Sequence, residues 1–274
     1  MTSTPIRMPV VFFGHCSPMN ALEHNDVTRV WRQIGAEMPR PKAILCVSAH
    51  WETHGSAVTA MEQPRTIHDF GGFPPALFAM EYAAPGSPAL AERVRALLLP
   101  DAALADQGWG LDHGTWSVLV HAYPAADIPV VQLSLDVALD GAGHYALARR
   151  LRALRAEGVL VIGSGNVVHN LRRMEWSAHA LAQPWATRFD AWVRARIEAR
   201  DHDALMAYTS EGADAPLAVP TAEHYLPLLY CLALQDDGDS VAFPVGGIAG
   251  GTVSMLSVLI GAARPDDAAL LTSA

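Results

Sequence analysis

Short apolar runs rich in β-branched residues alternate along the chain with longer segments of helical periodicity. The apolar runs cover residues 9–13, 43–47, 129–135, 159–162 and 241–245. Their continuous rather than alternating hydrophobicity is typical of strands that are covered on both faces. Between these runs, the spacing of apolar positions predicts helices at residues 27–37, 88–99, 145–157, 184–199, 202–208 and 225–234.

Strands that alternate with helices predict an α/β fold. We expect a central, mostly parallel or mixed sheet with helices on both faces. A chain of 274 residues fits one large domain, and no linker or internal repeat divides it. We therefore expect a single domain over residues 1–274, with a frayed tail at 264–274. Two long or glycine-rich segments, residues 54–88 and 106–116, are expected to form loops that shape a pocket.

Composition narrows the class of partner. A hydrophobic fraction of 51% with 17% charged residues is typical of a well-buried globular core. The net charge of -9 argues against nucleic acid or an anionic membrane surface, because both attract basic patches. No apolar run approaches the roughly 20 residues that span a bilayer. The three scattered cysteines, Cys16, Cys46 and Cys231, are typical of a reducing compartment, so we expect a cytoplasmic protein.

Four histidines occupy similar places in the pattern. His15 and His50 end predicted strands, and His169 follows another strand across a Gly-Ser-Gly turn. His224 stands near the start of a predicted helix. In open α/β sheets, sites form beyond the carboxyl ends of the strands, and imidazole is the commonest metal ligand. The repeated placement predicts a metal site, although each histidine taken alone could simply satisfy a local backbone group.

The surroundings of His224 and His169 add detail. Thr221 is a plausible N-cap that would place Glu223 and His224 in the first helical turn, where the helix dipole favours a neutral imidazole. Glu223 could instead be a ligand, or could only favour the helix terminus. The Gly-Ser-Gly turn before His169 lacks the lysine of a P-loop and does not form a Gly-x-Ser-x-Gly elbow. A serine hydrolase is therefore poorly supported.

Two further histidines lie in the predicted loops. His68 is followed by Asp69, and His113 is preceded by Asp112, so that an aspartate could orient each ring. Aromatic residues in these loops could hold a planar substrate, although ordinary core packing is an alternative for any one of them. The candidate walls are Phe70, Phe73, Trp109 and Trp116. Among the loop residues, we expect His68, Phe73 and Trp116 to bind substrate.

Six motifs, taken in order, resemble a known family. They are Gly-His-Cys-Ser-Pro-Met at 14–19, Ser-Ala-His-Trp at 48–51, His-Asp-Phe-Gly-Gly-Phe-Pro at 68–74, Leu-Asp-His-Gly at 111–114, Gly-Ser-Gly-Asn at 163–166 with His-Asn at 169–170, and His-Tyr-Leu-Pro at 224–227. Their order and spacing resemble the 4,5-DOPA dioxygenase extradiol family, a class III extradiol group related to protocatechuate 4,5-dioxygenase. The resemblance extends from about residue 9 to about residue 250.

This resemblance implies an α/β fold and one divalent metal per chain. Fe(II) is expected for activity, and Zn(II) is plausible as the bound ion. Carried over by motif, His15, His50 and His224 would hold the metal. His169 would be either a fourth ligand or a catalytic acid/base, and His113 would be a catalytic residue close to the substrate.

The implied reaction inserts O2 beside the diol of a catecholic, DOPA-like substrate and gives a semialdehyde product. A histidine with a pKa near neutrality suits the proton transfers. Cys16 stands where the family usually has glycine, so its side chain could narrow the pocket or place an oxidisable thiol beside the metal. The resemblance is compatible with a homo-oligomer, and it implies no nucleic-acid or membrane partner.

Two alternatives remain at this point. A zinc-dependent hydrolase would use metal-bound water, with Glu223 or His169 as the base. A non-catalytic metal or ligand carrier would tolerate substitution of His169 and His113. Oxygen uptake with catechols would separate the dioxygenase from both.

Overall fold

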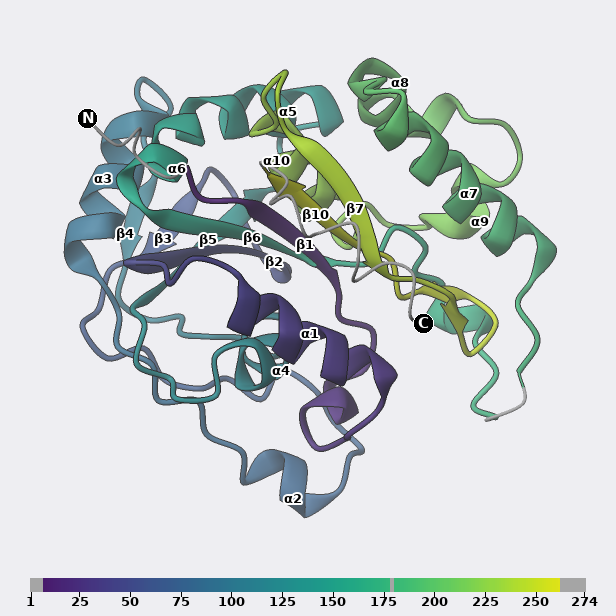
Figure 1. Ribbon diagram of the computed structural model, residues 1–274, viewed down its shortest axis with the longest axis horizontal. Helices are drawn as coiled ribbons and strands as arrows, with labels where there is room; N and C mark the ends of the chain where they lie inside the picture. The colour runs from purple at the N-terminus through teal and green to yellow at the C-terminus, as the bar shows by residue number, and fades with distance from the viewer. Residues whose placement is uncertain (1–6, 178–179, 262–274) are drawn as a thin grey trace.

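A central sheet of eight strands runs through the protein, whose structure is a computed structural model that describes residues 7–177 and 180–261 (Figure 1). The strands, in order across the sheet, are β4 (Leu104–Asp106), β3 (Ala57–Thr59), β5 (Val130–Asp136), β2 (Ala43–Thr53), β6 (Val159–Gly165), β1 (Val10–Gly14), β10 (Ser257–Gly261) and β7 (Ser240–Val245). A separate pair, β8 (Ile248–Ala249) and β9 (Val253–Ser254), forms a small hairpin.

The sheet is mixed. Strands β5, β2, β6 and β1 run parallel to one another, whereas β10 and β7 add antiparallel strands at one side of the sheet. At the other edge β3 is antiparallel to β5 and parallel to β4. The carboxyl ends of β1, β2 and β6 therefore lie side by side. This is the edge at which an open α/β sheet places its ligands.

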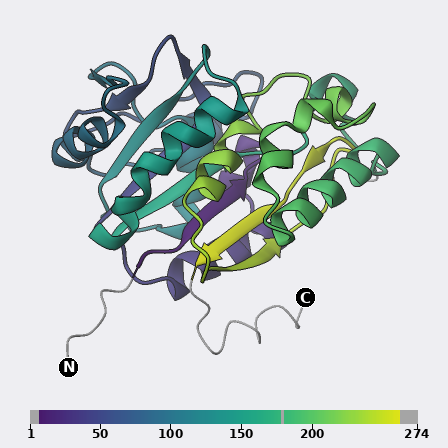
Figure 2. The same cartoon turned by 90° about the horizontal axis from the view of Figure 1, so that it is seen from above.

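Helices cover both faces of the sheet (Figures 1 and 2). Successive residues of β1 point to opposite faces of the sheet. Val10 and Phe12 pack into one hydrophobic core, and Val11 and Phe13 pack into the other. The first core includes residues of α3, α5, α7 and α10, and the second includes residues of α1 and α4. The helices are α1 (Asp26–Glu37), α2 (Pro75–Phe78), α3 (Pro88–Leu98), α4 (His113–Ala122), α5 (Gly141–Arg149), α6 (Ala153–Glu157), α7 (Pro184–Glu198), α8 (His202–Met206), α9 (Ala215–Ala218) and α10 (Leu226–Ala233).

The predicted α/β architecture is confirmed, with differences in detail. Each predicted strand and helix has a counterpart, although the helix expected at 145–157 is divided into α5, a 3-10 turn (Arg150–Arg152) and α6. Helix α4 was not predicted, and the segment expected to be a loop at 106–116 contains its first turn. Strand β2 continues past His50 to Thr53. The tail at 264–274 lies outside the described residues, and within them no helix is long and apolar enough to cross a membrane.

Candidate metal centre

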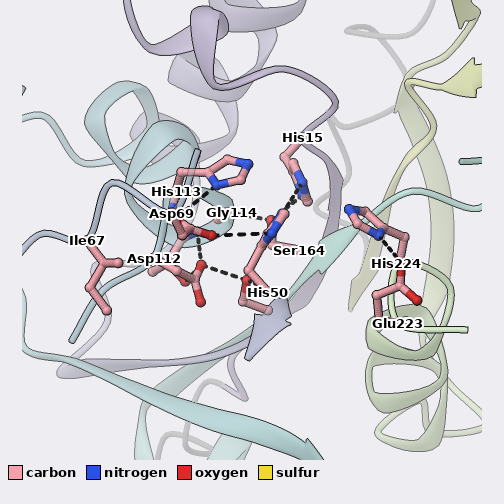
Figure 3. A network of polar contacts seen from close by, with 12 residues as sticks. His15, His50, Ile67, Asp69, Asp112, His113, Gly114, Ser164, Glu223 and His224 are labelled. Atoms are coloured by element: carbon pink, nitrogen blue, oxygen red, sulfur yellow. Dashed lines mark hydrogen bonds and ion pairs between the residues drawn. The ribbon is translucent and has the colours of Figure 1, made fainter. Parts of the chain in front are cut away.

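His15 leaves the sheet directly after β1 and has no exposed surface. Its Nδ1 lies 3.0 Å from the hydroxyl oxygen of Ser164 at the end of β6 (Figure 3). That hydroxyl donates its proton to the carbonyl of Gly114 at 2.5 Å. Because a serine has a single O–H, it must accept from Nδ1–H of His15. The Nε2 of His15 is therefore unprotonated and free to bind a metal.

His50 is turned toward His15 by a break in the strand register. The pairing of β2 with β5 shifts between Val47 and Glu52, and such bulges re-aim side chains beside active sites. Gly114 leaves the necessary room, since a Cβ there would lie 2.9 Å from Cδ2 of His50. The Nδ1 of His50 faces Oδ2 of Asp69 at 3.3 Å, which places the proton on Nδ1 and leaves Nε2 bare.

The two free Nε2 atoms of His15 and His50 are 3.0 Å apart (Figure 3). Two unprotonated nitrogens at this distance repel each other unless a cation or a proton lies between them. Burial, together with the neighbouring histidines, lowers the pKa of both rings well below the ordinary value. A metal with ligand bonds of about 2.0–2.1 Å places its nitrogen ligands about 3 Å apart. The pair therefore fits two ligands of one ion.

His224 completes a triangle with this pair. The ring centroids are 5.0 Å apart for His15 and His50, 5.5 Å for His15 and His224, and 5.1 Å for His50 and His224. The Nδ1 of His224 donates to Oε1 of Glu223 at 3.0 Å, so its Nε2 is also left without a proton. These three imidazoles border one space, and the ligand atoms that lie within 4.8 Å of one another fall into two groups, His15 with His50 and His113, and His224 with His169 and Glu223.

The local structure around His224 differs from the expected helix start. Thr221 does not cap a helix but donates its hydroxyl to Glu223, and α10 begins only at Leu226. Pro227 occupies the first turn, where its missing N–H costs no helical hydrogen bond. His224 therefore lies in the preceding turn. Its neutrality arises from burial, which lowers its pKa even though Glu223 opposes the shift.

Residues at the end of β6 contact the backbone of the turn that contains His224. The amide of Asn166 donates to the carbonyl of His224 at 2.8 Å. A Cβ on Gly165 would lie 2.2 Å from the same carbonyl, so a side chain there is sterically excluded. Gly165 therefore makes room for the backbone of a site residue.

His169 lies against the same ring but in a different geometry. It forms an isolated bridge with Val253, and its amide donates to Ala218. Its imidazole stacks on that of His224 with centroids 3.5 Å apart and planes 10° apart. Nitrogen lone pairs lie in the ring plane, so two stacked rings do not converge on one ion. Burial and the charge of His224 lower the pKa of His169 to about 3.

His113 is the first residue of α4 rather than a loop residue, because Asp112 caps the helix through Thr115. Its ring centroid is 3.9 Å from that of His50. Asp112 does not orient it; both carboxylate oxygens of Asp112 are engaged by other groups, including Ser48 and Gln132. The carboxylate beside His113 is Asp69, whose Oδ1 lies 3.0 Å from Nδ1.

Comparison with known proteins decides the family. The model of the family described as the catalytic LigB subunit of aromatic ring-opening dioxygenase matches residues 15–244. The chain belongs to the LigB family. It is 51% identical to a 4,5-DOPA dioxygenase extradiol of Escherichia coli (strain K12) over 95% of this chain and 97% of that protein. A 4,5-DOPA dioxygenase extradiol of Beta vulgaris is 39% identical over 79% and 83%.

The fold comparison agrees. A crystal structure of the uncharacterized protein JW3007 from Escherichia coli K12 superposes with a TM-score of 0.82 and 47% sequence identity, over 93% of this chain and 100% of that one. This LigB-family protein is therefore a metal-dependent enzyme of extradiol aromatic ring cleavage, and it acts on a small aromatic substrate with O2. The family relationship and the buried histidine cluster agree on a metal centre.

The residues of this LigB-family enzyme that we expect to bind substrate also make contacts within the protein. Trp116 of α4 has no exposed surface and donates its indole N–H to the carbonyl of Ile67. It therefore anchors the loop that contains Ile67 to α4. His68 donates through Nε2 to the carbonyl of Met80 at 2.9 Å. Both residues hold the loop that carries Asp69. Their predicted contact with substrate stays a prediction.

Phe70 is an aromatic neighbour of the site histidine His113. Its ring centroid lies 5.6 Å from that of His113 in an edge-on arrangement. Phe73, the predicted wall, packs on Phe70 at 5.4 Å. Trp109 stacks instead on Trp51, with centroids 5.5 Å apart.

Sequence reasoning missed the partners that orient the ligands. Ser164 was read only as part of a weak glycine-rich turn, yet it pairs with Phe13 across the parallel strands β1 and β6. A register assignment between these two strands could have placed it beside His15. Asp69 was assigned to its sequence neighbour His68, whereas it faces His50 and His113.

Proposed function

We propose that this enzyme opens the ring of a catechol beside its diol, with Fe(II) held by His15, His50 and His224. The observation that carries the proposal is the triangle of three imidazoles, the buried His15 and His224 and the half-buried His50, each with its Nδ1 beside a polar partner. Three neutral nitrogens suit iron or zinc and leave positions open for other ligands. When bound, Fe(II) supplies the open positions and the redox chemistry that a catechol and O2 require.

The substrate class follows from the relatives. Proteins named 4,5-DOPA dioxygenase extradiol occur among the matches from Escherichia coli, Beta vulgaris and Portulaca grandiflora, the last at 43% identity. We infer a DOPA-like catechol as the substrate and a semialdehyde as the product. The edge of Phe70 beside His113 offers an apolar contact for such a planar ring.

His169 and His113 are the proposed proton carriers. We infer that the imidazole of His169, which lies against that of His224, accepts a proton from a catechol hydroxyl and later returns it. Because the His169 ring is stacked on the His224 ring, the nitrogen lone pairs of the two rings do not point to the same ion. This geometry favours the acid/base role of His169 over that of a fourth ligand. A rotation of the His169 side chain would be required for it to close around zinc.

The test is oxygen uptake after anaerobic reconstitution with Fe(II). With DOPA and simple catechols, we expect equimolar consumption of O2 and catechol and a coloured ring-opened product, and no uptake by the zinc-loaded enzyme. Zinc-dependent cleavage of esters or amides without O2 consumption would overturn the proposal in favour of a hydrolase. Glu223 is poorly placed as the base of such a hydrolase, because His224 already occupies its carboxylate.

A further inference from the structure

One carboxylate contacts two of the site histidines. Oδ2 of Asp69 lies 3.3 Å from Nδ1 of His50, and Oδ1 lies 3.0 Å from Nδ1 of His113 (Figure 3). Oδ1 also accepts the backbone N–H of His113 at 2.9 Å. Among the described residues, the buried Nδ1 of His113 makes no hydrogen bond of good geometry, and Asp69 is the carboxylate within ion-pair distance of it. Asp69 thus joins a proposed metal ligand to a proposed proton carrier.

An ionised carboxylate can only accept hydrogen bonds. Each imidazole nitrogen that faces Asp69 must therefore carry the proton, and the opposite nitrogen of each neutral ring must be bare. For His50, the bare atom is the Nε2 that lies 3.0 Å from Nε2 of His15. A single acceptor consequently determines which nitrogen of each ring is free.

The loop that carries Asp69 is tied to the helix that carries His113. The amide of Ile67 donates to the carbonyl of Leu111 at 2.7 Å, and the amide of Leu111 donates to the carbonyl of Arg65 at 2.8 Å. The indole N–H of Trp116, a residue of α4, donates to the carbonyl of Ile67. This bracing holds the carboxylate in place before any ligand binds.

We propose that Asp69 is a positioning residue that holds His50 and His113 in the tautomer with Nδ1 protonated, so that both Nε2 atoms are free. The part of this proposal that concerns proton transfer by His113 rests on the proposed function. The part that concerns the tautomer and the metal affinity of His50 does not.

Asp69→Asn tests the proposal without changing the size of the side chain. The amide oxygen can still accept the backbone N–H of His113, but the NH2 group then faces Nδ1 of His50, where two donors oppose each other. His50 must turn away or move its proton to Nε2. Loss of such an outer partner typically weakens metal binding about 10–100-fold.

The readouts are the Zn(II) dissociation constant, from competition with a chelator, and the 15N chemical shifts of metal-free protein with labelled histidines. His50→Gln assigns the His50 signals. In the wild type, we expect the His50 signals of a ring protonated at Nδ1; in Asp69→Asn, we expect the pattern to reverse and the Zn(II) constant to rise about 10–100-fold.

Asp106→Asn is the matched control. Asp106 also anchors a loop, accepting the amides of Gly108 at 2.9 Å and Trp109 at 2.6 Å, but no contact joins it to an imidazole among the described residues. We expect this variant to lose some thermal stability and to keep the wild-type zinc affinity. An unchanged tautomer or an unchanged zinc constant in Asp69→Asn would overturn the inference. Neither readout requires dioxygenase activity, so failure of the proposed function would be seen separately.

Discussion

The two halves of the site are built differently. His15, His50 and His113 come from two central strands and the first turn of α4, and Ser164 and Asp69 hold their rings. His169 and His224 come from irregular segments, where the rings stack on each other. In this second half Glu223 bonds Nδ1 of His224, while the side chain of His169 has no hydrogen bond among the residues described.

The contrast lies in how firmly the side chains are held, because each half contributes both a proposed metal ligand and a proposed proton carrier. A metal site needs ligands whose lone pairs are fixed before the ion arrives. The first half meets this requirement with partners on the sheet and on a braced loop. A proton carrier must exchange partners during the reaction, and the less constrained His169 meets that requirement.

The largest expected effect comes from removing a ligand of the first half. His50→Ala should lose bound metal on dialysis and reduce oxygen uptake to that of the metal-free enzyme, because two imidazoles cannot hold the ion. Metal analysis and an oxygen electrode check this. His54→Ala is the control, since His54 is exposed and directly follows β2. Full metal content in His50→Ala would remove His50 from the ligand set.

The next effect concerns pH and involves both halves. Burial lowers the pKa of His15, His50, His169 and His224 in the folded protein, whereas the unfolded chain titrates near 6.5. Below pH 6.5 these histidines therefore bind protons in the unfolded chain but stay neutral in the folded protein. The free energy of unfolding should fall by about 1.4 kcal/mol per pH unit for each such histidine.

Denaturant titrations of metal-free protein between pH 7 and pH 5 measure this slope. His169→Gln removes one of these histidines, so the change in the free energy of unfolding with pH should become smaller by about 1.4 kcal/mol per pH unit. Stability that does not change between these pH values would contradict the burial of neutral histidines.

A smaller effect is expected from the partner of His224. Glu223→Gln should weaken zinc affinity by no more than about 10-fold, the lower end of the usual range, because the amide oxygen can still accept the Nδ1–H of His224. Chelator competition measures the change. Equal losses in Glu223→Gln and Asp69→Asn would show that the two halves hold their ligands equally well, whereas no loss in Glu223→Gln would show that the turn itself fixes His224.

The smallest effect concerns the residue after His15. Cys16 has a φ of +53°, a left-handed conformation that favours glycine, and burial raises the pKa of its thiol to about 11. Cys16→Gly should raise the free energy of unfolding by about 1 kcal/mol and leave metal content unchanged. Thermal denaturation would contradict this if the variant were less stable than the wild type.

The sequence predicted the elements that carry their own periodicity. The strands that end near His15 and His50 are continuous apolar runs, and these runs predicted both the sheet and its ligand edge. Helix α4 was missed because its start, Asp112 and His113, continues a glycine-rich stretch. Strands β3 and β4 have three residues each, too few for a hydrophobic pattern.

Side-chain partners were harder to predict than ligands. Asp69 and His113 are 44 residues apart, and their contact depends on how the loop from 60 to 74 folds against α4. Pairing Asp69 with its sequence neighbour His68 was therefore misleading. The placement of the histidines and the family resemblance predicted the ligands, and the three-dimensional structure supplied the groups that orient them.

The central claim is that the metal is held without His169. The most direct test is to measure iron content and oxygen uptake on the same anaerobically reconstituted sample of His169→Ala. We predict one iron per chain, as in the wild type, with a kcat for catechol lowered by roughly 10²–10⁴-fold, the usual contribution of a general acid/base. Loss of the iron together with the activity would show that His169 is a ligand, and would contradict its proposed role as acid/base.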